Sequence, residues 1–250
     1  MNDVDRATPL ETIAALLSGA TRDAVPIENA FVRATDPGRP APLSRFVSHR
    51  RERALRQYLL AHAVISSPGE YGPEWSSARD SRVWARALHL DERIPSNRTS
   101  VSKGWAWLES QHLIARPKTS RLATVQLLKD DGSGAPYERP TSNNFQLPHR
   151  FWLEGWDREL PLAATAALLI ALSLPRPFPF RVEEQAPRYG VSASFLAAGL
   201  RQLEQKDVLT HTEETVKAPL SPAGIAVVRR YRLADDWKVS DRPRVRDEAA

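Results

Sequence analysis

The sequence predicts a mainly α-helical fold of the α+β class, with small β-hairpins and two copies of one supersecondary unit. Helical periodicity of apolar residues dominates both halves of the 250-residue chain. In each half, short β-like runs follow the last helix. A match of the chain with itself indicates that the two halves repeat the same unit.

The internal repeat lies where the last helix of each half runs into a strand. The segment Gly104 to Glu109 (GWAWLE) matches Gly199 to Glu204 (GLRQLE), and an apolar pair follows each copy within a few residues. The shared leucine and its apolar neighbours are spaced to lie on one side of a helix. A glycine inside a helix costs about 1 kcal/mol, so we expect each glycine to mark close approach to a neighbouring helix.

The first half predicts three helices and a hairpin. The helices are expected from Ser44, as N-cap, to about Ala63, from Ala78 to Leu88, and from Asn97 or Thr99 to Gln111. Two β-like runs, Leu113 to Arg116 and Leu122 to Leu128, are expected to flank a basic turn.

The second half predicts the same order. An aromatic segment at 145–156 comes first, and a helix that begins at Pro161 follows it. Two more helices are expected, a short one at 182–187 and one from Ser192 to about Lys206. A strand at 208–212, a loop through Ser221 and a β-rich run at 225–233 complete the unit.

These patterns divide the chain into four segments. We expect an N-terminal arm and linker at 1–43, a first domain at 44–140, a second domain at 141–234 and a charged, frayed C-terminal tail at 235–250. The arm begins with a short amphipathic helix and continues into a linker rich in proline. It either packs on a partner chain or forms a loose tail.

Composition excludes several classes of function. Cysteine is absent, which excludes disulfides, thiolate metal sites and cysteine nucleophiles and suits a cytoplasmic location. The N-terminus lacks the positive charge of a signal peptide. The longest apolar stretch, Leu160 to Leu174, is shorter than the roughly 20 residues of a membrane span, so no membrane partner is expected.

No catalytic, metal or cofactor motif is found in the sequence. The six histidines are scattered, and the glycine-rich loops that bind nucleotides are missing. Asp130-Asp131 and Asp235-Asp236 are paired acids in stretches rich in turn residues, which favours surface turns. We therefore expect a protein that is not an enzyme and that holds neither a metal nor a cofactor.

Positive charge is concentrated in the first half. Residues 44–129 contain fifteen lysines and arginines against seven acids, whereas residues 149–234 contain eleven against nine. The whole chain carries a formal net charge of +5. A concentrated positive charge indicates an acidic partner, most simply nucleic acid.

The order of helices and hairpin, together with the Leu-Glu ending of each last helix, resembles the winged helix-turn-helix superfamily of bacterial regulators. Two such domains in one chain are similar to plasmid replication initiators. The segments FQLPHRFWLEGW and YGVSASFLAAGLRQLEQKDVL also look like a group of actinobacterial helix-turn-helix proteins. The resemblance covers about residues 44–234 and implies two tandem winged helix-turn-helix domains.

In that superfamily the third helix enters the major groove of DNA. Carried over to this chain, the contact residues of the first domain are Asn97, Arg98, Thr99, Ser102 and Lys103, with Ala106 beside them. The resemblance implies that Arg98 and Lys103 contact guanine or phosphate and that Asn97 contacts adenine or caps the helix. Lys118 and Arg121 would flank the tip of the wing, where they contact phosphates or a minor groove.

The second domain carries fewer candidate contacts. Its aligned positions are Ser192, Ser194 and Arg201, with Ala197 and Ala198 between them. Glu213 and Glu214 are expected in its wing loop, where they would repel phosphate. This domain therefore either contacts DNA weakly or serves mainly for dimerisation.

The tryptophans are expected to pack in the core, because most of them lie at helical core spacing. Trp107 is the exception: it aligns with Gln202 and is expected to be partly exposed, facing the other domain or a second subunit. The arginines near the start of the first domain, Arg50, Arg51, Arg53 and Arg56, either contact a DNA backbone or are simply solvated.

The leading hypothesis is sequence-specific binding of double-stranded DNA by a transcriptional regulator, with homodimerisation left open. Two alternatives remain. The chain is an initiator of plasmid or mobile-element replication, or it is a winged-helix module that binds other proteins.

Overall fold

The computed structural model describes residues 6–20, 22–35, 38–65, 75–117, 122–220, 222–237 and 239. Over these residues the chain combines α-helices with small antiparallel sheets. The α+β class is therefore confirmed in this general form.

The first repeated unit contains three helices and a three-stranded sheet. Its elements are α3 (Glu52–Ile65), β2 (Ser76–Arg79), α4 (Ser81–Ala87), α5 (Pro95–Ser110), β3 (Ile114–Ala115) and β4 (Ala123–Leu127). The strand order is β2-β4-β3, and both pairings are antiparallel. Asp80 fixes the start of α4, because its carboxylate accepts a hydrogen bond of 2.8 Å from the backbone N–H of Arg82.

The second unit has the same order of elements. It comprises α8 (Leu162–Leu172), β6 (Phe178–Pro179), α9 (Val182–Gln185), the 3-10 turn η2 (Ala186–Tyr189), α10 (Ala193–Gln205), β7 (Leu209–Lys217) and β8 (Ile225–Leu233). Its strand order, β6-β8-β7, places the last strand in the middle, as β4 lies in the first unit.

The sequence did not predict the first strand of either sheet. β2 has four residues, three of them small or hydroxylated, and β6 has only two. Strands this short show no alternation of apolar and polar residues, so the periodicity that identifies strands is absent from them. They form because the last strand of each unit offers a free edge.

The two glycines of the repeat lie where helices approach each other closely, as predicted. A Cβ atom on Gly104 would lie 2.1 Å from the side-chain oxygen of Gln57 in α3. A Cβ atom on Gly199 would lie 2.2 Å from the backbone oxygen of Ala163 in α8. A side chain would be tolerated less well at Gly199 than at Gly104, because the obstructing atom at Gly199 belongs to a helix backbone.

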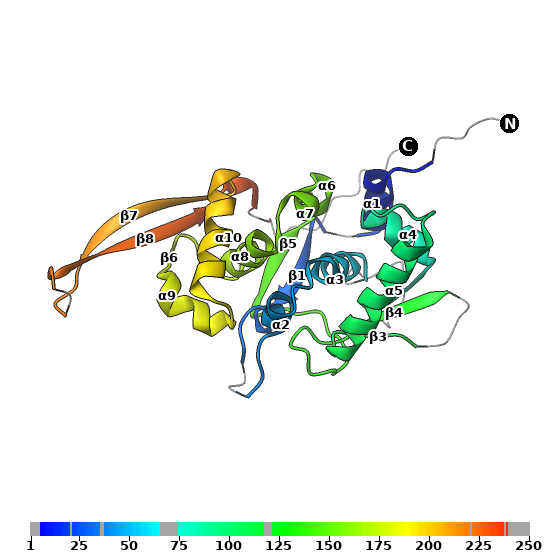
Figure 1. The fold of residues 1–250 in the computed structure, drawn as a ribbon, viewed down its shortest axis with the longest axis horizontal. Helices are drawn as coiled ribbons and strands as arrows, with labels where there is room; N and C mark the ends of the chain where they lie inside the picture. Colours follow the sequence, from blue (N-terminus) through cyan, green and yellow to red (C-terminus); the bar gives the residue numbers. More distant parts are fainter. Residues whose placement is uncertain are drawn as a thin grey trace.

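The remaining elements connect the two units. They are α1 (Pro9–Leu17), β1 (Ala24–Glu28), η1 (Asn29–Phe31), α2 (Pro42–Ser48), β5 (Asn144–Pro148), α6 (Arg150–Leu153), α7 (Trp156–Glu159) and η3 (Asp235–Trp237). β1 and β5 form an antiparallel pair in the middle of the molecule, with α4 and α5 on one side and α10 with its hairpin on the other (Figure 1).

The N-terminal segment is part of the core, so both expectations for it, a loose tail and an arm on a partner chain, are wrong for its described residues. Ile13, Val25, Ile27 and Phe31 have no exposed surface. α1 packs against α4 and α6. The segment is held because β5, within the aromatic segment, needs a partner strand and finds it in β1.

The helix expected from Ser44 is in fact two helices, α2 and α3. The chain turns between them at Arg50, whose φ angle is +51°. Ser44 is not an N-cap: it is buried inside α2, and its hydroxyl donates a hydrogen bond of 2.7 Å to the carbonyl of Ala41. Pro42, at the first turn of α2, fixes the actual start.

The two units share one continuous hydrophobic core. α2 packs against α8, and Gly190, which ends η2, lies so close to Ser44 that a Cβ atom would be 2.9 Å from the serine Cβ. A guanidinium nitrogen of Arg56 in α3 donates a hydrogen bond of 3.4 Å to the carbonyl of Arg158 in α7. These contacts fix the orientation of one unit relative to the other.

The chain after β8 returns to the core before it leaves the described residues. Trp237 is 2% exposed, and its carbonyl accepts a hydrogen bond of 3.1 Å from Arg176. The frayed tail expected from Asp235 onward is therefore wrong for η3. None of the described helices combines the length and the apolar character needed to cross a lipid bilayer.

Candidate nucleic-acid interface

The helix α5 buries one face and leaves the other open. Val101, Trp105 and Leu108 are buried, as their spacing predicted. Trp105 meets Trp84 of α4 edge-on, with 5.3 Å between ring centroids. Because these contacts anchor one side of the helix, the opposite side faces solvent.

The open face of α5 carries short polar side chains around a single cation. The open face of α5 consists of the exposed residues Thr99, Ser102, Lys103, Ala106 and Ser110. Their small size leaves the helix backbone accessible to another surface, and Lys103 supplies a positive charge. These properties suit a helix that enters the major groove.

Two of the expected contact residues lie at the edge of this face. Asn97 is half-buried, and its side-chain amide donates a hydrogen bond of 3.0 Å to the carbonyl of Asp91. This contact stabilises the turn between α4 and α5. α5 begins at Pro95, with Ile94 as N-cap, so Asn97 does not cap the helix. Arg98 is also half-buried and points toward the α4 side.

The corresponding helix of the second unit, α10, has a similar arrangement. Leu196, Leu200 and Leu203 are buried. The helix was expected to begin at Ser192, and this residue is its N-cap: the hydroxyl of Ser192 accepts a hydrogen bond of 3.2 Å from the backbone N–H of Phe195. Ser194 and Arg201 are exposed, so the exposed face of the last helix carries one cation in each unit, Lys103 in α5 and Arg201 in α10.

The hairpin of the second unit differs from the expectation. Glu213 and Glu214 lie in the long strand β7, not in a loop. Each is paired across the hairpin: Glu213 with Arg229 at 3.1 Å, and Glu214 with Arg230. The expectation of two free carboxylates in a wing loop is therefore wrong, because the opposite strand supplies a cation to each of them.

The hairpin of the first unit is described only in part. Lys118 and Arg121, the expected wing contacts, lie outside the described residues. At the base of this hairpin the guanidinium of Arg116 donates two hydrogen bonds, of 2.9 and 2.7 Å, to the carboxylate of Glu109. That pair joins the end of α5 to the segment after β3.

Trp107 is half-buried, in line with the partial exposure that was expected. Its ring packs edge-on against Phe46 of α2, with 4.7 Å between centroids. The guanidinium of Arg51 lies 5.8 Å from the ring centroid. Of the four arginines near the start of this unit, Arg51 thus covers a tryptophan and Arg53 donates a hydrogen bond of 2.6 Å to Ser100 of α5.

A buried polar network replaces the surface turn that was expected at Asp130. This residue is completely buried. Its carboxyl group accepts hydrogen bonds from the Tyr58 hydroxyl at 2.7 Å and from the backbone N–H of Glu28 at 2.9 Å, and His62 Nε2 lies 2.9 Å away. The network ties β1 to α3. Sequence reasoning missed it because paired acids after a strand resemble a turn.

Burial changes the acid–base properties around this network. It raises the pKa of the Tyr58 hydroxyl, and the nearby Asp130 acts in the same direction. It also raises the pKa of Glu28, again with a contribution from Asp130. Across the described chain, no group of three or more histidine, aspartate or glutamate side chains is placed to hold a metal ion.

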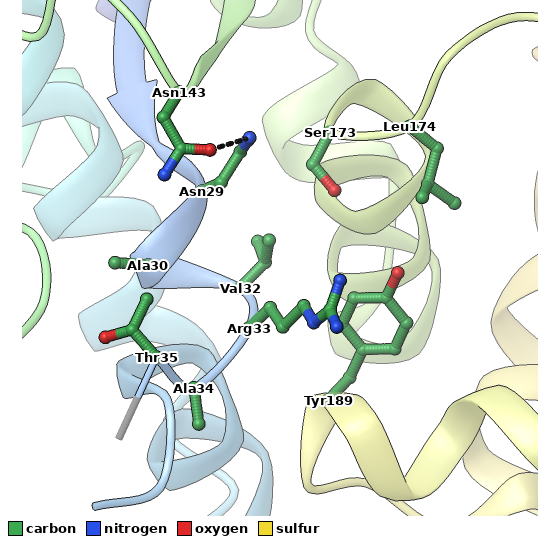
Figure 2. Close-up of a pocket in the computed structure, with 10 residues that line it drawn as sticks. All are labelled: Asn29, Ala30, Val32, Arg33, Ala34, Thr35, Asn143, Ser173, Leu174 and Tyr189. Carbon is green, nitrogen blue, oxygen red and sulfur yellow. Dashed lines mark hydrogen bonds between the residues drawn. The ribbon is translucent and has the colours of Figure 1, made fainter. Parts of the chain in front are cut away.

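A separate cavity of about 380 Å³ lies between the N-terminal segment and the second unit. Figure 2 shows Arg33 reaching toward Tyr189 from the opposite wall, and the side-chain amide of Asn29 donating a 3.0 Å hydrogen bond to Asn143. The described lining contains no carboxylate and no imidazole. It offers amide, hydroxyl and guanidinium groups to a small polar molecule, but no general base.

No family model, no curated protein and no solved structure matches this chain.

Proposed function

We propose that this chain binds double-stranded DNA through two tandem winged helix-turn-helix units, with α5 and α10 in successive major grooves. The repetition of one unit carries the proposal. Both units have the same order of helices and strands and the same strand order in the sheet, and both leave one face of the last helix exposed. A helix must be exposed in this way to enter the groove.

The distribution of charge supports this proposal. The excess of basic residues lies in the first half of the chain, which contains α5. In the second unit, arginines of the hairpin are engaged by glutamates. We therefore assign most of the affinity to the first unit, and a weaker contact through Ser194 and Arg201 to the second.

The shared core supports simultaneous binding of both units to one duplex. Since α2 packs on α8 and α3 is bonded to α7, the distance between the two exposed helices is fixed. A fixed distance selects sites at a fixed spacing. We infer a transcriptional regulator that recognises such a composite site.

The Lys103→Ala variant tests the proposal. Preferred sequences are first selected from a pool of random duplexes, and dissociation constants are then measured by fluorescence anisotropy. Loss of a groove contact is worth about 1–3 kcal/mol, so affinity should fall by roughly tenfold or more. Lys103 is exposed, so the melting temperature should stay within a degree or two of wild type, an order-of-magnitude expectation for surface substitutions.

Arg39→Ala is the matched control. Arg39 is an exposed cation near Arg45, whose guanidinium lies 3.5 Å from the carbonyl of Gln111 at the end of α5. It therefore carries the same charge at the far end of the same helix. Equal affinity of the Lys103→Ala and wild-type proteins would contradict the assignment of the open face of α5.

The same binding site supports a second role, initiation of plasmid or mobile-element replication. The observation in its favour is that one chain carries two unequal units at a fixed spacing. Footprinting separates the two roles, because an initiator protects direct repeats at an origin and a dimeric repressor protects an inverted repeat at a promoter.

An interaction with another protein remains the candidate from a different class. The hairpin of β7 and β8 projects from one end of the molecule (Figure 1), and Leu220, Ile225 and Val227 are exposed on it. Apolar residues exposed together are typical of contact surfaces. Absence of salt-dependent binding to any duplex, combined with self-association that Val227→Lys abolishes, would favour this function.

A further inference from the structure

An arginine pocket of about 530 Å³ lies beside the first turn of α5. It is formed by the segment that precedes α1, by α4, and by the turn between α4 and α5. Its lining residues are Arg6, Ala7, Arg82, Arg86, Glu92, Arg93 and Arg98. Five guanidinium groups therefore surround one cavity, together with a single carboxylate.

Two of these arginines are already engaged by neighbouring side chains. The guanidinium of Arg93 donates two hydrogen bonds, of 2.8 and 2.7 Å, to the carboxylate of Asp91. Arg86 donates a hydrogen bond of 2.7 Å to the hydroxyl of Thr12 and lies 3.4 Å from Glu92. These contacts hold the walls of the pocket and join α1 to α4.

The other three guanidinium groups have no such partner. Within the described part of the chain, the side chains of Arg6, Arg82 and Arg98 make no hydrogen bond and no ion pair. The single carboxylate of the lining, Glu92, lies 3.4 Å from Arg86. Asp91, outside the lining, is bound by Arg93, which lowers the pKa of that carboxyl to about 2, with a smaller contribution from Arg6. Three cations without a partner among the described residues therefore face one cavity.

Such an arrangement has an electrostatic cost unless an anion enters. Like charges at close range repel each other, whereas a guanidinium fork matches the oxygen atoms of a phosphate group. The backbone N–H groups at the start of α5, which begins at Pro95, add a partial positive charge to the same region. Both features favour the binding of an anion, and three guanidinium groups together can contact several oxygen atoms of one phosphate group.

We propose that the arginine pocket binds a phosphate group through Arg6, Arg82 and Arg98. The source that the structure favours is a phosphodiester of the DNA backbone, an assignment that rests on the proposed function. Arg98 lies one turn of α5 before Ser102 of the open face, so a duplex in contact with that face runs past the mouth of the pocket. The N-terminal segment, through Arg6, thereby becomes part of the DNA contact.

The test combines two probes with one variant, Arg82→Ala/Arg98→Ala, and the Arg39→Ala control. The first probe is a mixed-sequence duplex of about 30 base pairs, roughly three helical turns, titrated at a series of salt concentrations. The second is inorganic pyrophosphate, titrated by calorimetry. Circular dichroism checks that the double variant keeps the wild-type fold, as expected for side chains without partners.

The expected result is weaker binding of the double variant to every duplex by a similar factor, about tenfold at low salt, with the slope of log K against log salt smaller by about 1–2. The control should leave the slope unchanged from wild type. Pyrophosphate binding that the double variant loses, with an unchanged duplex slope, would confirm a phosphate site but assign it to a free phosphorylated ligand.

Two other outcomes separate this inference from the proposed function. If the wild type binds no duplex but binds pyrophosphate through Arg82 and Arg98, the DNA proposal fails and the phosphate site stands. If the double variant binds both probes as the wild type does, or if the wild type binds neither, the arginine pocket is not a phosphate site.

Discussion

The two repeated units differ most in the helix that each uses as its central support. In the first unit, α3 places Gln57, Tyr58 and His62 in the interior. In the second, α8 is built from alanine, leucine and isoleucine, with Thr165 as its polar exception. The same topology is therefore stabilised by a polar network in one copy and mainly by apolar packing in the other.

This difference follows from what each helix must hold in place. The network around Asp130 anchors β1 and thus the N-terminal segment to α3. α8 needs no such anchor, because α10 packs directly along it. Hydrogen bonds between buried polar groups require a specific orientation of the two partners, whereas apolar packing stabilises a contact without that requirement. Three experiments test this contrast.

The largest effect is expected at Asp130. Asp130→Ala leaves the Tyr58 hydroxyl, the His62 ring and the Glu28 N–H buried without their partner, and each such loss costs about 1–3 kcal/mol. The free energy of unfolding should fall by about 3–5 kcal/mol in total. Urea denaturation followed by tryptophan fluorescence measures this change.

The matched substitution in the second unit is Thr165→Val, which removes one buried hydrogen bond of 3.2 Å to the carbonyl of Leu160 at nearly constant volume. Its cost should be about 1 kcal/mol. Equal costs for the two variants would show that the polar network does not distinguish the units.

The next effect compares the two glycines of the repeat. In Gly199→Ala the new methyl group would meet the backbone of Ala163 at 2.2 Å, so α10 must move away from α8. Overpacking of this kind costs about 1–3 kcal/mol or more. In Gly104→Ala the obstructing atoms belong to the flexible side chain of Gln57, which rotates away and loses its 3.1 Å hydrogen bond to the Val101 carbonyl.

The expected order is therefore a larger loss of stability for Gly199→Ala than for Gly104→Ala, by about 1–2 kcal/mol. Thermal unfolding of both variants in the same buffer gives the comparison. A larger loss of stability for Gly104→Ala would contradict this expectation. It would mean that the contact between α3 and α5 accommodates an added methyl group less well than the contact between α8 and α10.

The smallest effect concerns a pair of titratable groups between the units. His89, after α4, and Asp157, in α7, have side chains 3.7 Å apart. Burial lowers the pKa of His89 from 6.5 to about 4, assisted by Arg158 and Arg56. Burial raises the pKa of Asp157 from 3.8 to about 6, although the same two arginines oppose this shift.

These two shifts act on stability in opposite directions. Between about pH 4 and 6 the folded state binds more protons than the unfolded state at Asp157, so this group makes stability fall as pH rises. Over about pH 4–6.5 the folded state binds fewer protons at His89, so that group makes stability rise. In the wild type the two contributions largely cancel.

Asp157→Asn removes the contribution of Asp157, which makes stability fall as pH rises, and keeps the contribution of His89. The variant should therefore gain stability as pH rises from about 4 to 6.5 and exceed the wild type at pH 7 by about 1–2 kcal/mol, since a buried charge is lost. Urea midpoints measured across this pH range give the result. A pH profile that matches the wild type would show that Asp157 is not held at a raised pKa.

Much of the local structure could be predicted from the sequence. Spacing and residue type predicted the buried faces of α5 and α10, the start of α10 near Ser192 and the close approach at both repeat glycines. The exposure of Thr99, Ser102 and Lys103 also follows, because it is the complement of the buried face. The partial burial of Asn97 and Arg98 could not be predicted in this way, because it depends on contacts with the turn before α5.

The errors at Asp130, Glu213 and Glu214 share one origin, contacts between residues far apart in the chain. Asp130 looks like part of a surface turn until β1 and α3 enclose it. Glu213 and Glu214 look free until Arg229 and Arg230 lie opposite them. Nothing near these residues in the sequence reports such partners, because strand pairing and helix packing join distant segments.

The sequence by itself determined the periodic elements, the repetition of the unit and the concentration of positive charge in the first half. The tertiary structure alone decided that the N-terminal segment belongs to the core, that β2 and β6 complete the two sheets, and that five arginines converge beside α5. Periodicity is a local property that side-chain spacing encodes, whereas convergence depends on how separate elements pack to bury their apolar faces.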